Sequence, residues 1–195
     1  MENFGTQAGQ APHRALWNYN LAKQSQSVFL NLATAGIPEG VDVPQGTLLD
    51  VDLETREASI VKNALVVAGG TTSSPRVAKG HFFQAGDFVF VTGDAVAVSS
   101  VDTTNADYDV LTLSGACTGA TAGNYLEQAK ASGASPELAH IPNLISSEWL
   151  YDFHDGNTIS CVAEIFSDVD TSVFYTPISP TMIAKINATG RYLLY

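Results

Sequence analysis

The feature that most constrains this chain is a series of short apolar segments separated by tight turns between residues 76 and 127. The turns Gly86-Asp87 and Gly93-Asp94 each separate two such segments. Short segments that recur every ~8–12 residues with turn residues between them are typical of a sandwich or a small barrel. The sequence therefore predicts a mainly β fold, built as a small β-barrel or β-sandwich.

Alternation of apolar and polar residues predicts further strands outside this region, because successive side chains of a strand point to opposite faces. These predicted strands are residues 27–33, 47–53, 59–67, 157–166, 181–187 and 191–195. Within residues 76–127, residues 108–113 are also predicted to form a strand.

Helix is predicted only as short segments near residues 14–26 and 135–153. In the second segment Ser135 is a candidate N-cap, and Pro136 suits the first helical position because its missing N–H is not needed there. Pro142 limits this helix to a turn or two. The first segment has apolar residues but no single apolar stripe.

Charge argues against nucleic-acid binding. The chain has 20 Asp and Glu against 9 Lys and Arg, a net charge of -11, whereas nucleic-acid affinity comes largely from neutralising phosphates. Charged residues make up only 15% of the chain, which suits surfaces that pack against neighbouring proteins because fewer charges must be desolvated.

The N-terminal sequence predicts synthesis in a cytoplasm and no membrane insertion. It lacks the basic start and apolar stretch of a signal peptide, and no apolar run approaches the ~20 residues of a membrane span. In a reducing cytosol, Cys117 and Cys161 are expected to be ordinary free thiols.

Candidate catalytic and metal-binding residues are few. The chain has no GxSxG nucleophile motif, and its histidines lie in unrelated contexts. Two acidic sets are candidate calcium ligands: Asp50, Asp52 and Glu54 along one strand face, and the loop with Asp102, Asn105, Asp107 and Asp109. Solvated strand faces and Asx turns explain both sets better. We therefore expect no catalytic residues, no metal and no cofactor.

One resemblance points to a function. The run from Arg76 to Val89, with its Gly86-Asp87 turn, and its continuation through Asp102 to Leu113 resemble the head-fibre and capsid-decoration proteins of tailed bacteriophages. Residues 44–127 carry the likeness. It implies a structural accessory protein, a homotrimer bound to the major capsid protein on the outer surface of the virion and made in the host bacterial cytoplasm.

The aromatic residues between positions 82 and 90 also favour an oligomer, because one small β layer cannot hide all of them. The expected organisation is an N-terminal arm, residues 1–26, followed by a β domain, residues 27–195, with a division into two subdomains near residue 128 left open. The arm is polar but contains large aromatics, which are common anchors of binding interfaces. Its candidate capsid contacts are Phe4, Arg14, Trp17 and Tyr19.

Two alternatives to capsid decoration stay open. A glycan-binding or adhesin-like β module of the virion or tail would present exposed aromatics on one face. An enzyme of the trimeric dUTPase type would need an Asp and Ser/Arg constellation at a subunit interface, which the sequence does not display.

Overall fold

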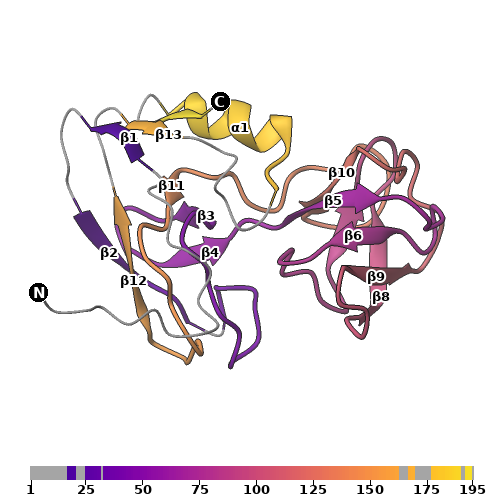
Figure 1. Cartoon of the computed structure of the whole chain (residues 1–195), viewed down its shortest axis with the longest axis horizontal. Helices are drawn as coiled ribbons and strands as arrows, with labels where there is room; N and C mark the ends of the chain where they lie inside the picture. The colour runs from indigo at the N-terminus through magenta and orange to yellow at the C-terminus, as the bar shows by residue number, and fades with distance from the viewer. Residues whose placement is uncertain are drawn as a thin grey trace, which may run out of the picture.

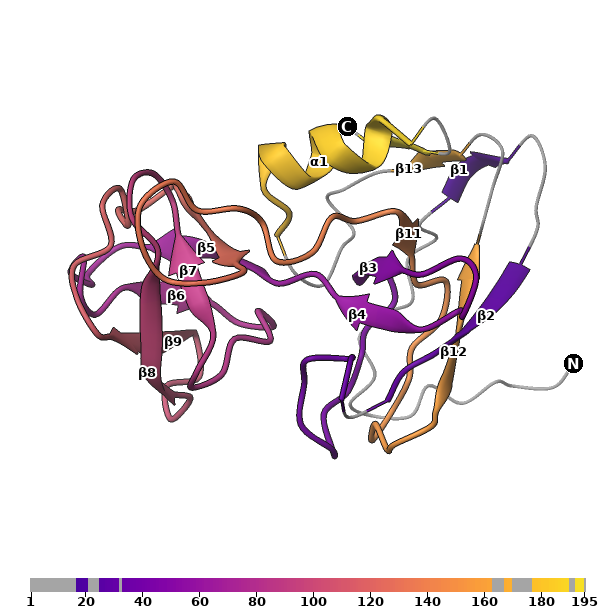
Figure 2. The same ribbon diagram turned by 180° about the vertical axis from the view of Figure 1, so that it is seen from behind.

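The computed structural model describes residues 17–20, 25–31, 33–162, 167–169, 177–189 and 192–194. These residues form two bodies that lie side by side and are joined by two chain segments (Figures 1 and 2). We call residues 63–129 the barrel and the remaining described elements the base. The prediction of a mainly β fold is confirmed.

The barrel is a closed, fully antiparallel sheet in the order β10-β5-β6-β9-β8-β7. Its strands are β5 (Asn63–Val67), β6 (Arg76–Ala78), β7 (Phe88–Phe90), β8 (Val96–Asp102), β9 (Tyr108–Leu113) and β10 (Tyr125–Ala129). Gly86 adopts a φ of +97°, a conformation that glycine reaches without steric cost, so the Gly86-Asp87 turn forms where the sequence predicts it.

The base combines elements from both sides of the barrel in the sequence. Its sheets are β1-β13-β14, β11-β3-β4 and β12-β2. Its elements are β1 (Trp17–Asn20), β2 (Ser25–Phe29), β3 (Leu48–Val51), β4 (Ala58–Ile60), β11 (Leu144–Ile145), β12 (Thr158–Val162), β13 (Ser167–Val169), α1 (Pro180–Asn187) and β14 (Tyr192–Leu194).

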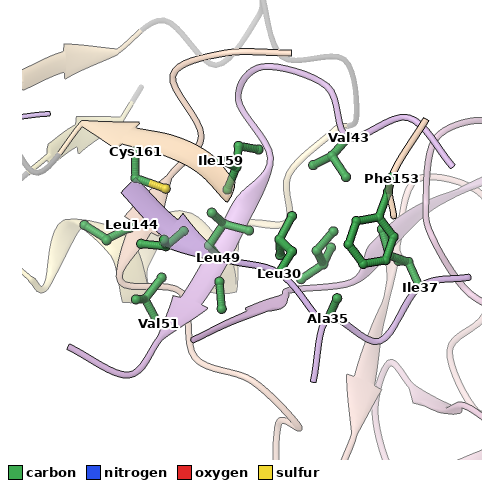
Figure 3. Close-up of a cluster of buried hydrophobic side chains, with 13 residues drawn as sticks. Leu30, Ala35, Ile37, Val43, Leu49, Val51, Leu144, Phe153, Ile159 and Cys161 are labelled. Carbon is green, nitrogen blue, oxygen red and sulfur yellow. The ribbon is translucent and has the colours of Figure 1, made fainter. Parts of the chain in front are cut away.

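Each body has its own buried apolar core. In the base, Leu30 and Leu49 from the first half of the chain pack with Ile159 from the second half (Figure 3). In the barrel, Val77 and Leu111 belong to a separate cluster. Burial of a large aliphatic side chain stabilises a fold by ~1.5–3 kcal/mol, so the base depends on contacts between residues more than a hundred positions apart.

The single strand predicted for residues 59–67 is wrong. The structure contains β4 in the base and β5 in the barrel, separated by Val61 and Lys62. Val61 is buried with α1, whereas the Lys62 side chain is buried in an ion pair with Asp87 of the barrel. The chain therefore passes from one body to the other within a largely apolar run that contains no Gly or Pro.

The helix predicted near residues 135–153 is absent. Ser135 has a φ of +58°, whereas an N-cap residue is normally extended. The segment instead folds back along β10, where the Lys130 N–H donates to the Glu137 carbonyl at 3.0 Å. β11 occupies another part of the predicted range.

The helix predicted near residues 14–26 is also wrong for the described residues of that range. β1 pairs with β13, and β2 pairs with β12. Backbone pairing with strands from the far end of the chain satisfies the N–H and C=O groups that a helix would have satisfied locally.

The one helix within the described residues, α1, lies where residues 181–187 were predicted to be a strand. Ser179 is extended, with φ -68° and ψ 149°, and its side chain accepts a hydrogen bond from the Met182 N–H. Pro180 occupies the first turn, and Met182 and Ile186 bury one face. Ser179-Pro180 thus carries the same local helix-start signal as Ser135-Pro136, but only at Ser179 do the apolar side chains of the following helix pack into a core.

Two observations bear on domain organisation. β2 runs across the boundary expected after residue 26, and the last barrel strand ends at Ala129, next to the possible division near residue 128. The division into an N-terminal arm and a β domain stays a prediction.

Candidate functional site

A cavity of about 670 Å³ lies between the barrel and the base. Residues 80–85, Ser100 and Thr103 line it from the barrel, and Asp42 and Trp149 line it from the base. We call it the interlobe cavity. Pockets of about 300–1,000 Å³ between structural units are common ligand sites.

The loop of residues 80–85 joins β6 to β7 within the barrel, lines one wall of this cavity and contacts the base. Phe82 has a φ of +61°, in the left-handed region that a residue with a Cβ rarely adopts. Phe82 packs against the core of the base, although its neighbour Phe83 belongs to the core of the barrel. The strained backbone at Phe82 thus lets two adjacent aromatics bury in different cores.

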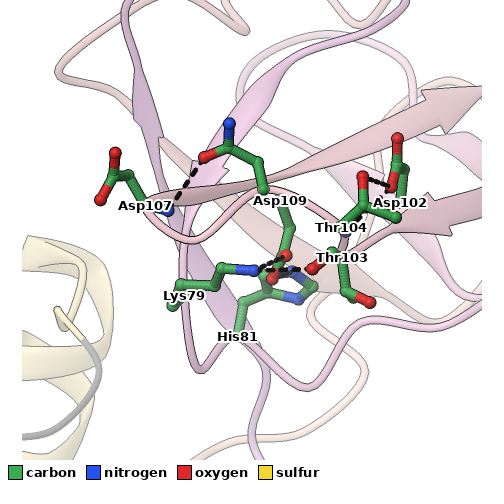
Figure 4. Close-up of polar contacts among 8 residues, drawn as sticks. Lys79, His81, Asp102, Thr103, Thr104, Asp107 and Asp109 are labelled. Atoms are coloured by element: carbon green, nitrogen blue, oxygen red, sulfur yellow. Dashed lines mark hydrogen bonds and ion pairs between the residues drawn. The ribbon is translucent and has the colours of Figure 1, made fainter.

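Three polar side chains, Lys79, His81 and Asp109, hold this loop to β9 and to Thr103, which follows β8 (Figure 4). His81 Nε2 lies 3.2 Å from Asp109 Oδ2, and Lys79 Nζ donates a short hydrogen bond to Asp109 Oδ1. Lys79 Nζ also donates to the Thr103 carbonyl at 3.2 Å. Asp109 is therefore a buried carboxylate between two nitrogen partners.

The contacts of His81 define its protonation state. Its Nδ1 accepts a hydrogen bond from the Phe83 N–H at 2.9 Å, so the ring proton lies on Nε2, facing Asp109. Nε2 lies within ion-pair distance of Asp109 but makes no hydrogen bond among the described residues. Burial lowers the pKa of His81, and Asp109 opposes this shift. Because both ring nitrogens of His81 face protein atoms, the side chain stabilises the loop and is not placed to take a proton from a bound molecule.

A buried ion pair forms the first of two polar junctions between barrel and base. Lys62 Nζ lies 2.7 Å from Asp87 Oδ2, with side-chain exposures of 1% and 10%. Asp87 also accepts from the Gln84 N–H at 2.9 Å and from Gln128 Nε2 at 3.0 Å. On the base side, the Lys62 chain passes Gly36, where an added Cβ would lie 3.6 Å from Lys62 Cε. Burial lowers the pKa of Lys62, and Asp87 counteracts this shift.

The second polar junction lies at the start of α1. The Ser179 hydroxyl donates to Glu127 Oε1 at 2.7 Å and accepts from the Met182 N–H at 3.1 Å. The Ser179 N–H donates to Asn63 Oδ1 at 3.0 Å. All of these groups are buried. The two junctions therefore restrain the orientation of the barrel on the base, since buried polar groups must keep their partners.

The structure describes two of the four predicted capsid-contact residues. Phe4 and Arg14 lie outside the described residues. Trp17 and Tyr19 lie in β1, whose backbone pairs with β13 of the same chain. Their role in contacting a partner stays a prediction.

The acidic residues considered for calcium make other contacts. Asp52 Oδ1 accepts from the Glu54 N–H at 2.8 Å, and Asp102 Oδ1 accepts from the Thr104 N–H at 3.0 Å. These backbone hydrogen bonds lower the pKa of both carboxyl groups. Asp50 lies 3.4 Å from His140 Nδ1. Among the residues that the structure describes, no group of three or more His, Cys, Asp or Glu is arranged to hold a metal ion.

The two cysteines are unpaired, as predicted. Cys117 is buried in the barrel and Cys161 in the base. Burial raises the pKa of the Cys117 thiol and raises that of Cys161 to about 12.

Sequence reasoning missed the residues that build the junctions and the interlobe cavity. A signal for Lys62 exists, because Lys62-Asn63 interrupts the apolar run between Ile60 and Val67. No local signal marks Trp149, because the cavity forms only when residues from both bodies meet.

Comparison of the chain with family models, with curated proteins and with solved structures finds no match. No helix in the described part of the chain is long and apolar enough to cross a membrane.

Proposed function

We propose that this chain is a structural accessory protein that binds the outer surface of a phage capsid and stabilises or decorates it. The observation that carries the proposal is a closed barrel restrained on a base by two buried polar junctions. A projecting unit with a restrained orientation is what a repeating lattice requires, because each copy must present the same surface.

The resemblance to head-fibre and decoration proteins supports the same proposal. Residues 76–113, which carry most of the likeness, form four of the six barrel strands, β6 to β9. On this proposal the base binds the major capsid protein and the barrel projects from it.

A trimer belongs to the proposal on narrower grounds. Phe82 is covered by the base of its own chain, so fewer of the barrel aromatics need a second subunit. Phe88 and Phe90 remain partly exposed on β7, and they are the barrel residues we assign to the contact between subunits.

Mass spectrometry of purified virions from a phage that encodes this chain tests the proposal. We expect the protein in every preparation, in a fixed ratio to the major capsid protein. Absence from virions in which the gene is expressed would contradict it.

The arm is tested by deleting residues 2–16, which removes Phe4 and Arg14 and leaves β1 in place. A longer deletion would remove strands of the base and confuse binding with folding. We expect the shortened protein to keep its melting temperature and to lose capsid binding. Full capsid binding would show that the contact lies elsewhere.

A further inference from the structure

We propose that the interlobe cavity binds a neutral saccharide of one or two sugar units. The inference rests on the residues that line the cavity and is independent of capsid binding. Its volume of about 670 Å³ lies within the usual range for small-ligand sites.

An aromatic surface on the base wall favours a sugar ring. Trp149 lines the cavity, and its ring stacks on Tyr151 with centroids 5.7 Å apart and planes 24° apart. The stacking pairs one face of the indole with Tyr151, and the same Trp149 side chain contributes to the cavity wall. A rigid, partly apolar ring surface suits the C–H face of a sugar, as aromatics suit amphipathic ligands generally.

Polar groups around the same cavity match sugar hydroxyls. Asp42 uses Oδ1 to accept the Asp152 N–H at 2.9 Å, and Oδ2 has no hydrogen-bond partner among the described residues. Ser100 and Thr103 are exposed, and their hydroxyls likewise make no hydrogen bond within the described part of the chain. A carboxylate accepts hydrogen bonds, whereas hydroxyls both donate and accept, so the cavity offers what a polyhydroxyl ligand needs.

Charge argues for a neutral ligand. The chain carries a net charge of -11, and Lys79, the cation beside the cavity, is already paired with Asp109. An acidic sugar or a phosphate would face the Asp42 carboxylate without a cation to pair with. A purely apolar ligand would remove water from Asp42 without replacing its hydrogen bonds, which is costly.

The barrel wall also argues against a bound extended peptide. Every barrel strand is paired on both sides, so that wall offers no strand edge to which a peptide could add by backbone hydrogen bonds. A peptide ligand is an outcome that the test below distinguishes.

The test uses the fluorescence of Trp149 in the full-length chain. The protein has two tryptophans, so Trp17→Phe leaves Trp149 as the single reporter. Lactose, maltose and N,N′-diacetylchitobiose are the neutral probes, and sialyllactose, which adds a carboxylate to the lactose core, is the charged comparison. We expect saturable quenching or a spectral shift with at least one neutral probe and a weaker response to sialyllactose than to lactose.

Variants then locate the site. Asp42→Asn keeps an acceptor for the Asp152 N–H and removes the charge, and we expect about tenfold weaker binding, the usual effect of losing a charged hydrogen bond. Thr103→Val keeps the side-chain shape and should weaken binding ~2–10-fold. Phe29→Ala is the control, because Phe29 is 46% exposed and lies outside the cavity lining; its affinity should be unchanged.

Several outcomes would overturn the inference. These are no response to any neutral probe, equal affinity in Asp42→Asn and Thr103→Val, tighter binding of sialyllactose than of lactose, or displacement of the sugar by a virion-derived peptide at lower concentration. Thr103→Val keeps the test decisive if Asp42→Asn does not fold. Virion mass spectrometry reports separately on capsid association, so failure of either proposal is recognised without reference to the other.

Discussion

The buried ion pair between Lys62 and Asp87 makes a sharp prediction, because its two partners are not equivalent. Lys62 is 1% exposed and has Asp87 as its ionic partner. Asp87 is 10% exposed and also accepts hydrogen bonds from Gln84 and Gln128. Loss of Asp87 therefore leaves the buried Lys62 cation without its ionic partner. Loss of Lys62 leaves the Asp87 carboxylate with two hydrogen-bond donors.

We expect Asp87→Asn to lower the free energy of unfolding by about 3–5 kcal/mol, the usual cost of removing one partner of a buried pair. For a chain of this size, that corresponds to a fall in melting temperature of roughly 6–20 °C. Lys62→Met keeps the length of the side chain without the charge, and because Asp87 retains two other hydrogen-bond donors it should cost only ~1–3 kcal/mol. The double variant, which combines Lys62→Met with Asp87→Asn, should be more stable than Asp87→Asn alone, because it contains no unpaired buried charge.

Asp87→Asn should also change the pH dependence of stability. Burial already lowers the pKa of Lys62, and Asp87 is the group that raises it. Without Asp87 the pKa of folded Lys62 falls further below its unfolded value, so the unfolded chain binds more protons over a wider pH range. Stability should then rise with pH over a wider range below the usual pKa of lysine in the variant than in the wild type.

Equilibrium unfolding in urea, followed by circular dichroism, measures all of these free energies. Lys130→Met is the control, because the Lys130–Glu137 pair has a similar length of 3.0 Å but exposures of 61% and 76%. An exposed pair of this kind contributes ~0–1 kcal/mol. If Asp87→Asn costs no more than the control, or Lys62→Met costs more than Asp87→Asn, the reasoning about this junction is wrong.

Three further predictions concern buried polar groups. Ser179→Ala removes the N-cap of α1 and the bond to Glu127, and we expect a loss of ~1–3 kcal/mol in urea unfolding; a loss below ~0.5 kcal/mol would contradict the second junction. The lowered pKa of buried His81 means that the unfolded chain binds more protons below about pH 6.5. Stability should therefore fall on acidification, and His81→Asn should reduce this slope; an unchanged slope would show that other groups cause it. Cys117 and Cys161 are buried with raised pKa values, so Ellman's reagent should label them only on unfolding; rapid labelling of the native protein would show that they are accessible.

The features of the barrel that could be predicted are those that depend on residues close together in the sequence. The strand predicted at residues 108–113 is β9 (Tyr108–Leu113), because alternation of apolar side chains is a local property of a half-buried strand. The turn at Gly86-Asp87 forms as expected, since Gly86 supplies the positive φ that the turn needs. The unpaired state of Cys117 and Cys161 also followed from the sequence.

The sequence by itself thus determined the β character of this protein, the positions of its tight turns and the acidic charge that disfavours anionic partners. The tertiary structure decided the rest. Ser135-Pro136 and Ser179-Pro180 carry the same local signal, but only the second begins a helix, because Met182 and Ile186 find a core to enter. The ion pair of Lys62 and the interlobe cavity likewise depend on residues that meet only after the barrel has closed and the two ends of the chain have formed the base. Contacts of this kind join segments far apart in the sequence, and no local pattern of residues predicts which segments will be neighbours in the folded protein.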